Sequence, residues 1–298
     1  MSRPLPVWRS LLFVPVNVER YVEKAHARGA DAIQLDLEDS VPLAQKAEAR
    51  TMVREAARRV STGGADVVVR INRPVRMALA DLEACVWPEV GAIALPKVAG
   101  AVHVRLIAEV IDELEAERGM PVGTTKLIAM IETAEAYFEA REIAAAHPRL
   151  VGLNLGAEDF AVSTGMLPEA DGLYVPKMTI VMAARAAGVL PLGFIGTVAD
   201  YADLDAFRAT IRRSRRLGFR GSSCIHPGQV AILNEEFAPS PEEVDHAQGM
   251  LSAYDDAIAA GRGSVEYRGK MIDVPVVERA RELIAVHDAI AARQGGSP

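Results

Sequence analysis

Apolar runs and amphipathic segments alternate along the first 227 residues of the chain. Eight of the runs are rich in Val, Ile, Leu and Ala and short enough to be buried strands. Segments with helical patterning lie between them, among them residues 19–28, 43–60, 101–118, 176–187 and 204–217. The eight predicted strands are residues 10–14, 32–37, 66–71, 92–96, 127–131, 150–155, 190–197 and 218–225.

Eight repeats of a strand followed by a helix predict an α/β fold, the (β/α)8 TIM barrel. The alternative is a doubly wound sheet of six or seven strands. That fold would want a Gly-rich phosphate-binding turn after its first strand. The chain has Val-Pro-Val-Asn at residues 14–17 instead, which favours the barrel.

The alternation stops after Pro227. Two further helical segments follow, at about residues 241–260 and 275–292, and a Gly-rich link at residues 261–269 joins them as a hairpin or an extended loop. The sequence therefore predicts a barrel over residues 1–227 and a C-terminal helical segment over residues 228–298, which would serve as a lid or an oligomerisation arm.

Residues 126–160 read as a strand, a helix and a second strand, and each strand leads into an acid, Glu132 or Asp159. A crossover of this length makes the strands parallel and adjacent, so both acids are expected at the same edge of the sheet. Neighbouring carboxylates repel unless a cation lies between them, and Mg²⁺ suits such a pair. The alternative is that either acid only caps the helix that follows it.

Other predicted strands also end in ionisable residues, as expected of a barrel whose catalytic groups come from strand ends. Arg70 could grip a substrate carboxylate or an enolate oxygen, or it could form a salt bridge to Glu38 or Asp39. Strand alternation puts Asp36 and Glu38 on one face and Asp39 near the rim. We expect these acids to orient metal-bound waters or Arg70.

Lys97 follows the fourth predicted strand. A lysine at a barrel mouth can form a Schiff base when its pKa is lowered. Nearby acids would instead keep it charged, which favours an electrostatic role. His226 comes after the eighth strand, where capping of the next helix is the expected function.

Composition limits the classes of function. The formal net charge of −7 argues against a surface for nucleic acid or acidic membranes. Two cysteines, Cys85 and Cys224, suggest no disulfide framework. The early apolar run at residues 11–14 is too short for a signal peptide or a membrane span, so a cytoplasmic protein is expected.

Several motifs, in order along nearly the whole chain, resemble the citrate lyase beta subunit-like family of CoA-ester lyases. They are RSLLFVP at residues 9–15, GADAIQLDLEDSV at 29–41, VRIN at 69–72, LPK at 95–97, IET at 131–133, GAED at 156–159, IHPGQ at 225–229 and GKMID at 269–273. The resemblance implies a (β/α)8 barrel that depends on Mg²⁺, with Mn²⁺ as a substitute, and that forms homotrimers or hexamers.

The resemblance also implies residue roles. Glu132 and Asp159 would be the metal ligands, and Arg70 would contact the substrate. Asp273 would be an acid/base carboxylate that reaches in from a neighbouring subunit. Arg9 and Lys24 fall where the family has basic residues near the CoA nucleotide, so both would bind substrate. We also expect Glu38 and Asp39 to be catalytic residues and Pro96 to be a substrate-binding residue.

The expected reaction is cleavage or formation of a 3-hydroxyacyl-CoA, such as malyl-CoA or citramalyl-CoA, with an acyl-CoA and a small 2-oxo acid as the other partners. A thioesterase of the malyl-CoA type is the nearest alternative, because water could attack the thioester. The second alternative is a ligand-binding relative without catalysis. A binding protein would need none of Glu132, Asp159, Arg70 and Asp273, so their joint presence favours an enzyme.

Overall fold

The computed structural model of the protein describes residues 5–198 and 203–295. The chain forms two compact units, Met1–Phe237 and Ala238–Pro298. Helix α10 (Pro227–Glu236) follows the predicted boundary at residue 227 and yet belongs to the first unit, because it packs on α9 (Leu204–Arg216) and on the first strand. No helix within the described ranges is both long and apolar enough to cross a membrane.

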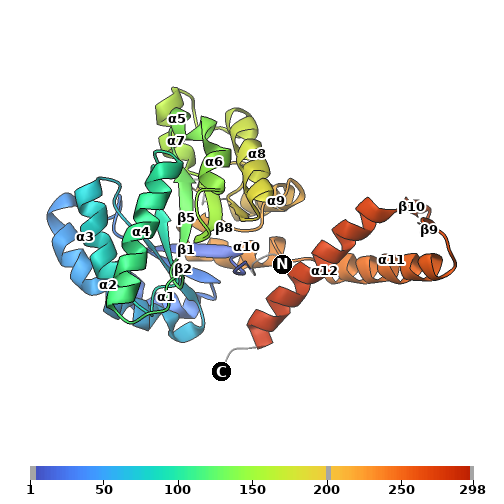
Figure 1. The fold of residues 1–298 in the computed structure, drawn as a ribbon, viewed down its shortest axis with the longest axis horizontal. Coiled ribbons are helices and arrows are strands. Elements are labelled where there is room, and N and C mark those ends of the chain that lie inside the picture. Colours follow the sequence, from blue (N-terminus) through green and yellow to red (C-terminus); the bar gives the residue numbers. More distant parts are fainter. Residues whose placement is uncertain (1–4, 199–202, 296–298) are drawn as a thin grey trace. The chain divides into compact units, whose positions relative to one another are not determined.

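Eight parallel strands form the nearly closed barrel of the first unit, as predicted (Figure 1). Main-chain hydrogen bonds from Arg220 N to Pro191 O (3.0 Å) and from Gly193 N to Gly221 O (2.8 Å) join the last two strands. The strands are β1 (Ser10–Pro15), β2 (Ala32–Asp36), β3 (Asp66–Arg70), β4 (Ala92–Leu95), β5 (Lys126–Ile131), β6 (Leu150–Leu155), β7 (Leu190–Leu192) and β8 (Ser222–Cys224).

Helices follow the strands and cover the outside of the barrel (Figure 1). Short 3-10 turns at His26–Arg28, Leu43–Gln45 and Ser61–Gly63 extend the first two. The remaining helices of this unit are α1 (Glu19–Ala25), α2 (Lys46–Val60), α3 (Val75–Cys85), α4 (Ala101–Glu117), α5 (Ala134–Phe138), α6 (Ala140–Ala144), α7 (Ala157–Thr164) and α8 (Ala170–Ala187).

Several boundaries differ from the sequence prediction. The eighth strand covers only Ser222–Cys224 rather than residues 218–225, and three other strands end one residue early. The seventh strand ends at Leu192 rather than at residue 197, because Gly193 and Gly196 have φ of 122° and 155° and leave the extended conformation. Helix α8 begins at Ala170 and continues through Pro176, which was predicted to start it. A proline inside a helix was not expected, since it removes one backbone donor.

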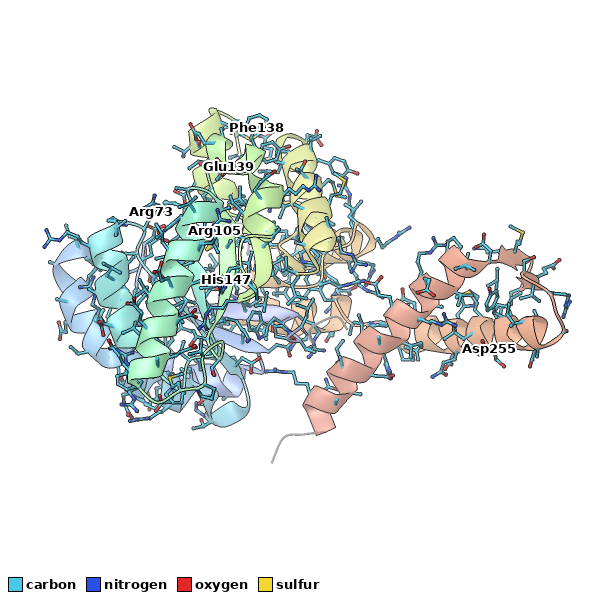
Figure 2. The ribbon with its side chains drawn as sticks, viewed as in Figure 1. Arg73, Arg105, Phe138, Glu139, His147 and Asp255 are labelled. Carbon is cyan, nitrogen blue, oxygen red and sulfur yellow. The ribbon has the colours of Figure 1, made fainter. Side chains whose placement is uncertain are left out.

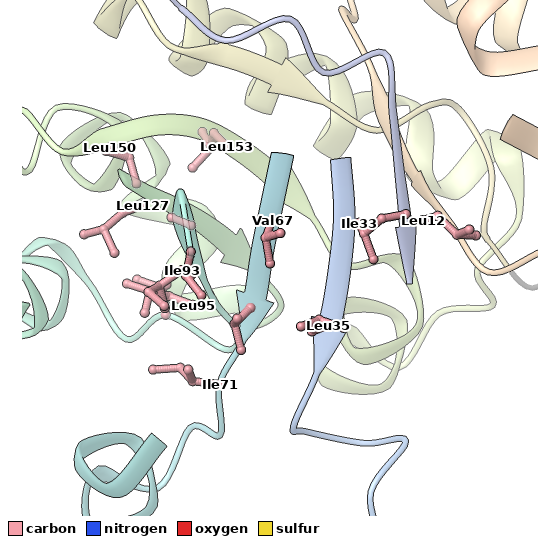
Figure 3. Close-up of a cluster of buried hydrophobic side chains, with 14 of the residues drawn as sticks. Leu12, Ile33, Leu35, Val67, Ile71, Ile93, Leu95, Leu127, Leu150 and Leu153 are labelled. Atoms are coloured by element: carbon pink, nitrogen blue, oxygen red, sulfur yellow. The ribbon is translucent and has the colours of Figure 1, made fainter. Parts of the chain in front are cut away.

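Strand alternation divides the core into two layers. The outer layer joins the strands to the helices, and Figure 3 shows some of its side chains, including Ile33, Leu35, Val67 and Ile93. The inner layer comes from β-strands and the segment before them, so it fills the barrel interior. Its members are Trp8, Leu11, Ala32, Val68, Ala92, Ala94, Ile128, Met130, Val151 and Leu192.

The second unit is a helical pair with a small hairpin. Helix α11 (Pro241–Ala259) and helix α12 (Val274–Gly295) flank the strands β9 (Val265–Tyr267) and β10 (Lys270–Ile272), in agreement with the predicted helices and link. Arg268 and Gly269 both have positive φ, as a tight two-residue hairpin turn requires. A small cluster of Tyr254, Ile272 and Val277 forms the core of this unit.

Because β8 lies close to β1 where the barrel closes, adding one methyl group at Gly221 should lower the stability of the protein. A Cβ on Gly221 would lie 1.8 Å from the main-chain oxygen of Trp8, so Gly221→Ala must push β8 away from β1. We expect a loss of about 2–4 kcal/mol in the free energy of unfolding, measured by chemical denaturation. Gly91→Ala is the matched control, because its Cβ would meet nothing closer than 3.6 Å. Equal stability of the two variants would contradict this explanation.

Candidate active site

The register between β2 and β3 and the alternation of side chains along each strand bring an acidic and a basic side chain into contact at the barrel mouth. Asp36 follows the interior residue Ala32 by four positions, and Arg70 follows the interior residue Val68 by two, so both side chains point to the interior side. Asp36 and Arg70 are also direct partners in the β2–β3 register. The strand pairing therefore places the two side chains next to each other.

Arg70 makes a bidentate ion pair with Asp36. Its Nε and Nη2 atoms donate to the two carboxylate oxygens at 2.7 and 2.8 Å, and its Nη1 lies 3.0 Å from Glu38 Oε2. Burial acts to raise the pKa of Asp36, but the hydrogen bonds and charge of Arg70 outweigh it and lower that pKa. The guanidinium also stacks on the ring of Phe13, 4.7 Å from its centroid. The salt bridge considered from the sequence is thus present, with Asp36 as its main partner.

Lys97 continues this series of opposite charges. Its Nζ donates to Glu38 Oε1 at 2.7 Å and lies 3.5 Å from Asp159 Oδ1 and 3.6 Å from Asp39 Oδ2. Burial acts to lower the pKa of Lys97, but the hydrogen bond and charge of Glu38, together with the charges of Glu132 and Asp39, outweigh it and raise that pKa. The amine is therefore protonated at neutral pH, which agrees with the expected electrostatic role and argues against a Schiff base.

Glu132 follows β5 and is almost fully buried. Its Oε2 accepts a 2.5 Å hydrogen bond from the main-chain N–H of Lys97. Burial, helped by the charges of Glu38 and Asp159, raises the pKa of Glu132 to about 8. Gly156 makes room for this side chain, since a Cβ there would lie 2.3 Å from Glu132 Oε1.

Asp159 lies in the first turn of α7, four residues beyond the end of the adjacent parallel strand β6. Its side chain is 40 % exposed. Helix α5, which follows Glu132, is capped by the side chain of Thr133, which accepts a hydrogen bond from Ala136 N. Glu132 therefore does not cap that helix. The helix-cap alternative therefore fails for Glu132, while the first-turn position of Asp159 does suit the helix dipole.

The Glu132–Asp159 pair has the donor chemistry that a divalent cation such as Mg²⁺ needs. Within residues 5–198 and 203–295, no set of three or more His, Cys, Asp or Glu side chains is arranged to hold a metal. Mg²⁺ is commonly bound by one or two carboxylates, with water and substrate oxygens as its other ligands. A cation between these carboxylates would also offset the repulsion that raises the pKa of Glu132.

A cavity of about 790 Å³ opens beside these charges within the first unit. Asp36 and Arg70 form part of its wall, and Phe13 and Pro15 contribute apolar surface. Its lining also includes Tyr21 and the basic residues Arg20, Lys24 and Arg28 from one side of α1 and the turn after it. The volume is that of a site for a sizeable small molecule, and its basic side suits an anionic one.

The remaining expected site residues are placed as follows. Pro96 is buried directly before Lys97, and Asp39 is largely exposed near the rim. Asp273 lies in the second unit, where its side chain accepts a hydrogen bond from Val276 N at the start of α12. His226 caps α10 as expected, with its side chain accepting from Gly228 N.

Arg9 does not join the group at the barrel mouth. It lies before β1, at the opposite end of the strands from Arg70, and its guanidinium is buried against Asp31 and the carbonyl of Asn234. This buried ion pair gives Arg9 a structural role, in place of the expected contact with the CoA nucleotide. Sequence reasoning missed Arg20 and Arg28, although their spacing of four residues on either side of Lys24 on one helical face was visible.

Comparison with known proteins identifies relatives over almost the full length. Residues 9–227 match the family described as HpcH/HpaI aldolase/citrate lyase. The chain is 37 % identical over 284 residues to the citrate lyase subunit beta of Leuconostoc mesenteroides subsp. cremoris, covering 94 % of this chain and 93 % of that protein. It is 34 % identical over 295 residues to a (3S)-malyl-CoA thioesterase of Cereibacter sphaeroides (strain ATCC 17029 / ATH 2.4.9), covering 98 % and 99 %.

Among solved structures, CitE from Mycobacterium tuberculosis in complex with magnesium, acetoacetate and coenzyme A is similar. The TM-score is 0.73 at 31 % identity, and the match covers 94 % of this chain and 97 % of that chain. Its barrel fold agrees with the architecture described above.

The Asp36–Arg70 pair predicts a stability effect that depends on pH. Asp36→Asn leaves a buried guanidinium without its bidentate partner, so the free energy of unfolding at pH 7 should fall by about 3 kcal/mol. The folded-state pKa of Asp36 is depressed, so its stabilisation is present above the unfolded value of about 3.9 and is lost as the pH falls through the folded value. The gap between variant and wild type should therefore narrow below about pH 4.

Denaturant titrations across this pH range would measure that gap. Glu278→Gln is the control, because its partner Arg281 forms an exposed ion pair with it and little change is expected at any pH. A gap for Asp36→Asn that is constant with pH would contradict the ion-pair explanation.

Proposed function

Because the chain belongs to the HpcH/HpaI aldolase/citrate lyase family, we propose that it is a Mg²⁺-dependent carbon–carbon lyase. Its substrate would be a 3-hydroxyacyl-CoA such as malyl-CoA or citramalyl-CoA, and the products an acyl-CoA and a small 2-oxo acid. The observation that carries this proposal is that Glu132, Asp159 and Arg70 are connected through Lys97 and Glu38 at one barrel mouth. Arg70 also lines the cavity with the basic wall.

Glu132 and Asp159 are the residues that would hold the metal. When bound, Mg²⁺ supplies Lewis-acid stabilisation of negative charge on the oxygens of the hydroxy-acid half of the substrate. Glu38 and Asp39 would act from around Lys97 and Arg70, by keeping both cations in place. The relative that was solved with magnesium and acetoacetate supports a small-acid site of this kind.

The proposed chemistry assigns the remaining steps to this chain's own side chains. In cleavage, the substrate hydroxyl loses its proton, the electron pair of the broken C–C bond passes to the acyl α carbon, and that carbon gains a proton. Arg70 would stabilise the enolate oxygen that carries this charge. Asp273 would deliver the proton to the α carbon, or remove it in the reverse direction. The proton of the hydroxyl would pass to water, from which Asp273 would regain a proton, so Arg70 and Asp273 would both act on the acyl half.

The CoA portion would lie along the basic side of the cavity. Arg20, Lys24 and Arg28 supply three positive charges at successive helical turns, a spacing that suits a chain of phosphates. Pro15 and Phe13 provide apolar surface next to them. The coenzyme A bound to the solved relative supports this assignment of the ligand class.

A thioesterase is the second candidate function. The match over nearly the full length to a (3S)-malyl-CoA thioesterase favours it. It would use the same metal and the same cavity, with water attacking the thioester carbonyl. The two reactions differ in their products, because hydrolysis releases free CoA and lyase cleavage releases acyl-CoA.

The active unit is proposed to be a homo-oligomer, a trimer or a hexamer, in which Asp273 of one subunit serves the barrel of a neighbour. Family resemblance supports this arrangement. Apolar side chains exposed on the barrel's outer helices, such as Phe138 at 82 % (Figure 2), offer surface that association could bury. Sedimentation of the purified protein would test the state directly.

A substrate panel with Mg²⁺ tests the main proposal. Malyl-CoA, citramalyl-CoA and related esters would be incubated with the protein, and the products identified by mass spectrometry. We expect acyl-CoA plus a 2-oxo acid. Glu132→Gln should lose turnover by at least about a hundredfold together with Mg²⁺ binding, because it removes a charged ligand.

Thermal melting with and without Mg²⁺ controls for folding, since the neutral Gln keeps the shape of Glu132. Full activity of the wild type after exhaustive chelation would refute the metal site. Release of free CoA as the sole CoA product would replace the lyase by the thioesterase.

Asp273→Asn separates the two candidate reactions. Asparagine caps a helix as well as aspartate does, so α12 should keep its start and the protein its melting temperature. Carbon–carbon cleavage should fall by about 10²–10⁴-fold, because the acyl carbon loses its acid/base partner. Product analysis by mass spectrometry would measure both reactions, and hydrolysis does not need that proton moved.

Mixing subunits tests the shared site. Asp273→Asn subunits mixed with Glu132→Gln subunits should regain some lyase activity, since some interfaces then pair an intact Asp273 with an intact Glu132. Asp273→Ala can be compared with Asp273→Asn, because alanine removes the helix cap as well as the carboxylate, whereas asparagine removes only the carboxylate. Proven subunit exchange without any rescue would rule out the shared-site arrangement.

A further inference from the structure

Lys97 contacts both carboxylates of the proposed metal site through two different groups. Its main-chain N–H donates to Glu132 at 2.5 Å, and its ammonium lies 3.5 Å from Asp159. Glu38 binds the same ammonium more closely, at 2.7 Å. A single residue therefore links the two acids that come from β5 and α7.

The backbone of Lys97 is held in an unusual conformation. Its φ is 47°, in the left-handed region that residues with a Cβ seldom adopt. The carbonyl of Lys97 accepts a 2.9 Å hydrogen bond from Arg73 Nε, and the next N–H, of Val98, donates to Met130 O at 3.2 Å. Both bonds hold the peptide between Lys97 and Val98, and the bond to Glu132 holds the N–H of the peptide before it.

The ammonium of Lys97 closes a row of alternating charges. The row runs from Asp36 through Arg70 and Glu38 to Lys97 and ends at Asp159. Asp159 is the most exposed carboxylate in it, with a side-chain exposure of 40 %. A positive charge 3.5 Å away both holds this side chain and offsets the charge that a divalent cation would otherwise balance.

Building on the metal site of the proposed function, we propose that Lys97 is a positioning residue that presets the Glu132–Asp159 pair. Its main-chain N–H fixes Glu132. Its ammonium acts as an internal counter-ion that holds Asp159 until a divalent cation takes over that charge. The ammonium and the cation therefore compete for the same negative charge, which lowers the affinity for Mg²⁺ and stabilises the metal-free protein.

Lys97→Met tests the counter-ion, because it keeps an unbranched side chain only one atom shorter and removes the charge. The metal-free variant should melt at a lower temperature than the wild type in EDTA, since the acids around it lose a cation. Its dissociation constant for Mg²⁺, from isothermal titration calorimetry, should fall by about tenfold or more. Lys97→Arg keeps the charge and should restore both values toward those of the wild type.

The outcomes separate the counter-ion from a structural role. An Mg²⁺ affinity of Lys97→Met that is unchanged or weaker than that of the wild type overturns the proposal. If Lys97→Arg gains as much Mg²⁺ affinity as Lys97→Met, the proposal is also overturned, because loss of the positive charge would not explain the gain. Absence of Mg²⁺ binding in the wild type would instead refute the proposed metal site.

A second pair of variants tests the backbone role without any metal. Lys97→Gly and Lys97→Ala both lose the ammonium, but only alanine keeps the strain of a Cβ at positive φ. In EDTA, Lys97→Gly should therefore melt at a higher temperature than Lys97→Ala, the reverse of the usual order. An alanine variant as stable as the glycine variant, or more stable, would show that the left-handed conformation does not hold the N–H on Glu132.

Discussion

Ionisable groups at the mouth of an apolar barrel are stable only when each is balanced by its neighbours. A carboxylate or guanidinium that loses its partner in such a place costs several kcal/mol. Asp36 meets this constraint because the β2–β3 register puts Arg70 directly opposite. Glu38 meets it by lying between Arg70 and Lys97. Glu132 meets it least well. Burial and the charges of Glu38 and Asp159 raise its pKa to about 8.

The barrel supplies the geometry that this balance needs. Alternation along each strand directs small and aliphatic side chains into the barrel interior. Charged side chains lie at the C-terminal ends of β2 and β3. Close approach matters as much as alternation, because Gly156 leaves space that Glu132 occupies and Gly221 lets β8 reach β1. The second unit adds Asp273 as the cap of α12, in a segment whose own core is small.

Much of the fold could be predicted from the sequence, because it depends on the hydrophobic period of each segment and on the order of strands and helices. Strand–helix alternation predicted the barrel, and a crossover of ordinary length predicted that the strands leading to Glu132 and Asp159 are adjacent and parallel. The Asp36–Arg70 pair was missed because its two residues lie 34 positions apart, and only the register between strands brings them together. The N–H of Lys97 was missed because a left-handed φ at a lysine has no signature in the sequence.

The limits of elements were the weakest part of the prediction, for a related reason. Pro176 normally marks a helix start, but the turns before it are held by tertiary packing of residues such as Leu173. The family resemblance located Asp273, which periodicity could not single out. The same resemblance misplaced Arg9, because a basic residue beside an apolar strand can equally be a buried partner of Asp31.

The row of alternating charges has a consequence for how this protein can change over evolutionary time. Arg70, Glu38 and Lys97 each touch an opposite charge on two sides, so the effect of replacing one depends on what stands at the next. We therefore expect substitutions here to be non-additive: a neutral residue at Lys97 should be tolerated better once Glu38 is also neutral. Divergence of this site toward a new substrate would therefore proceed through paired replacements, while the cavity wall formed by α1 can vary one residue at a time.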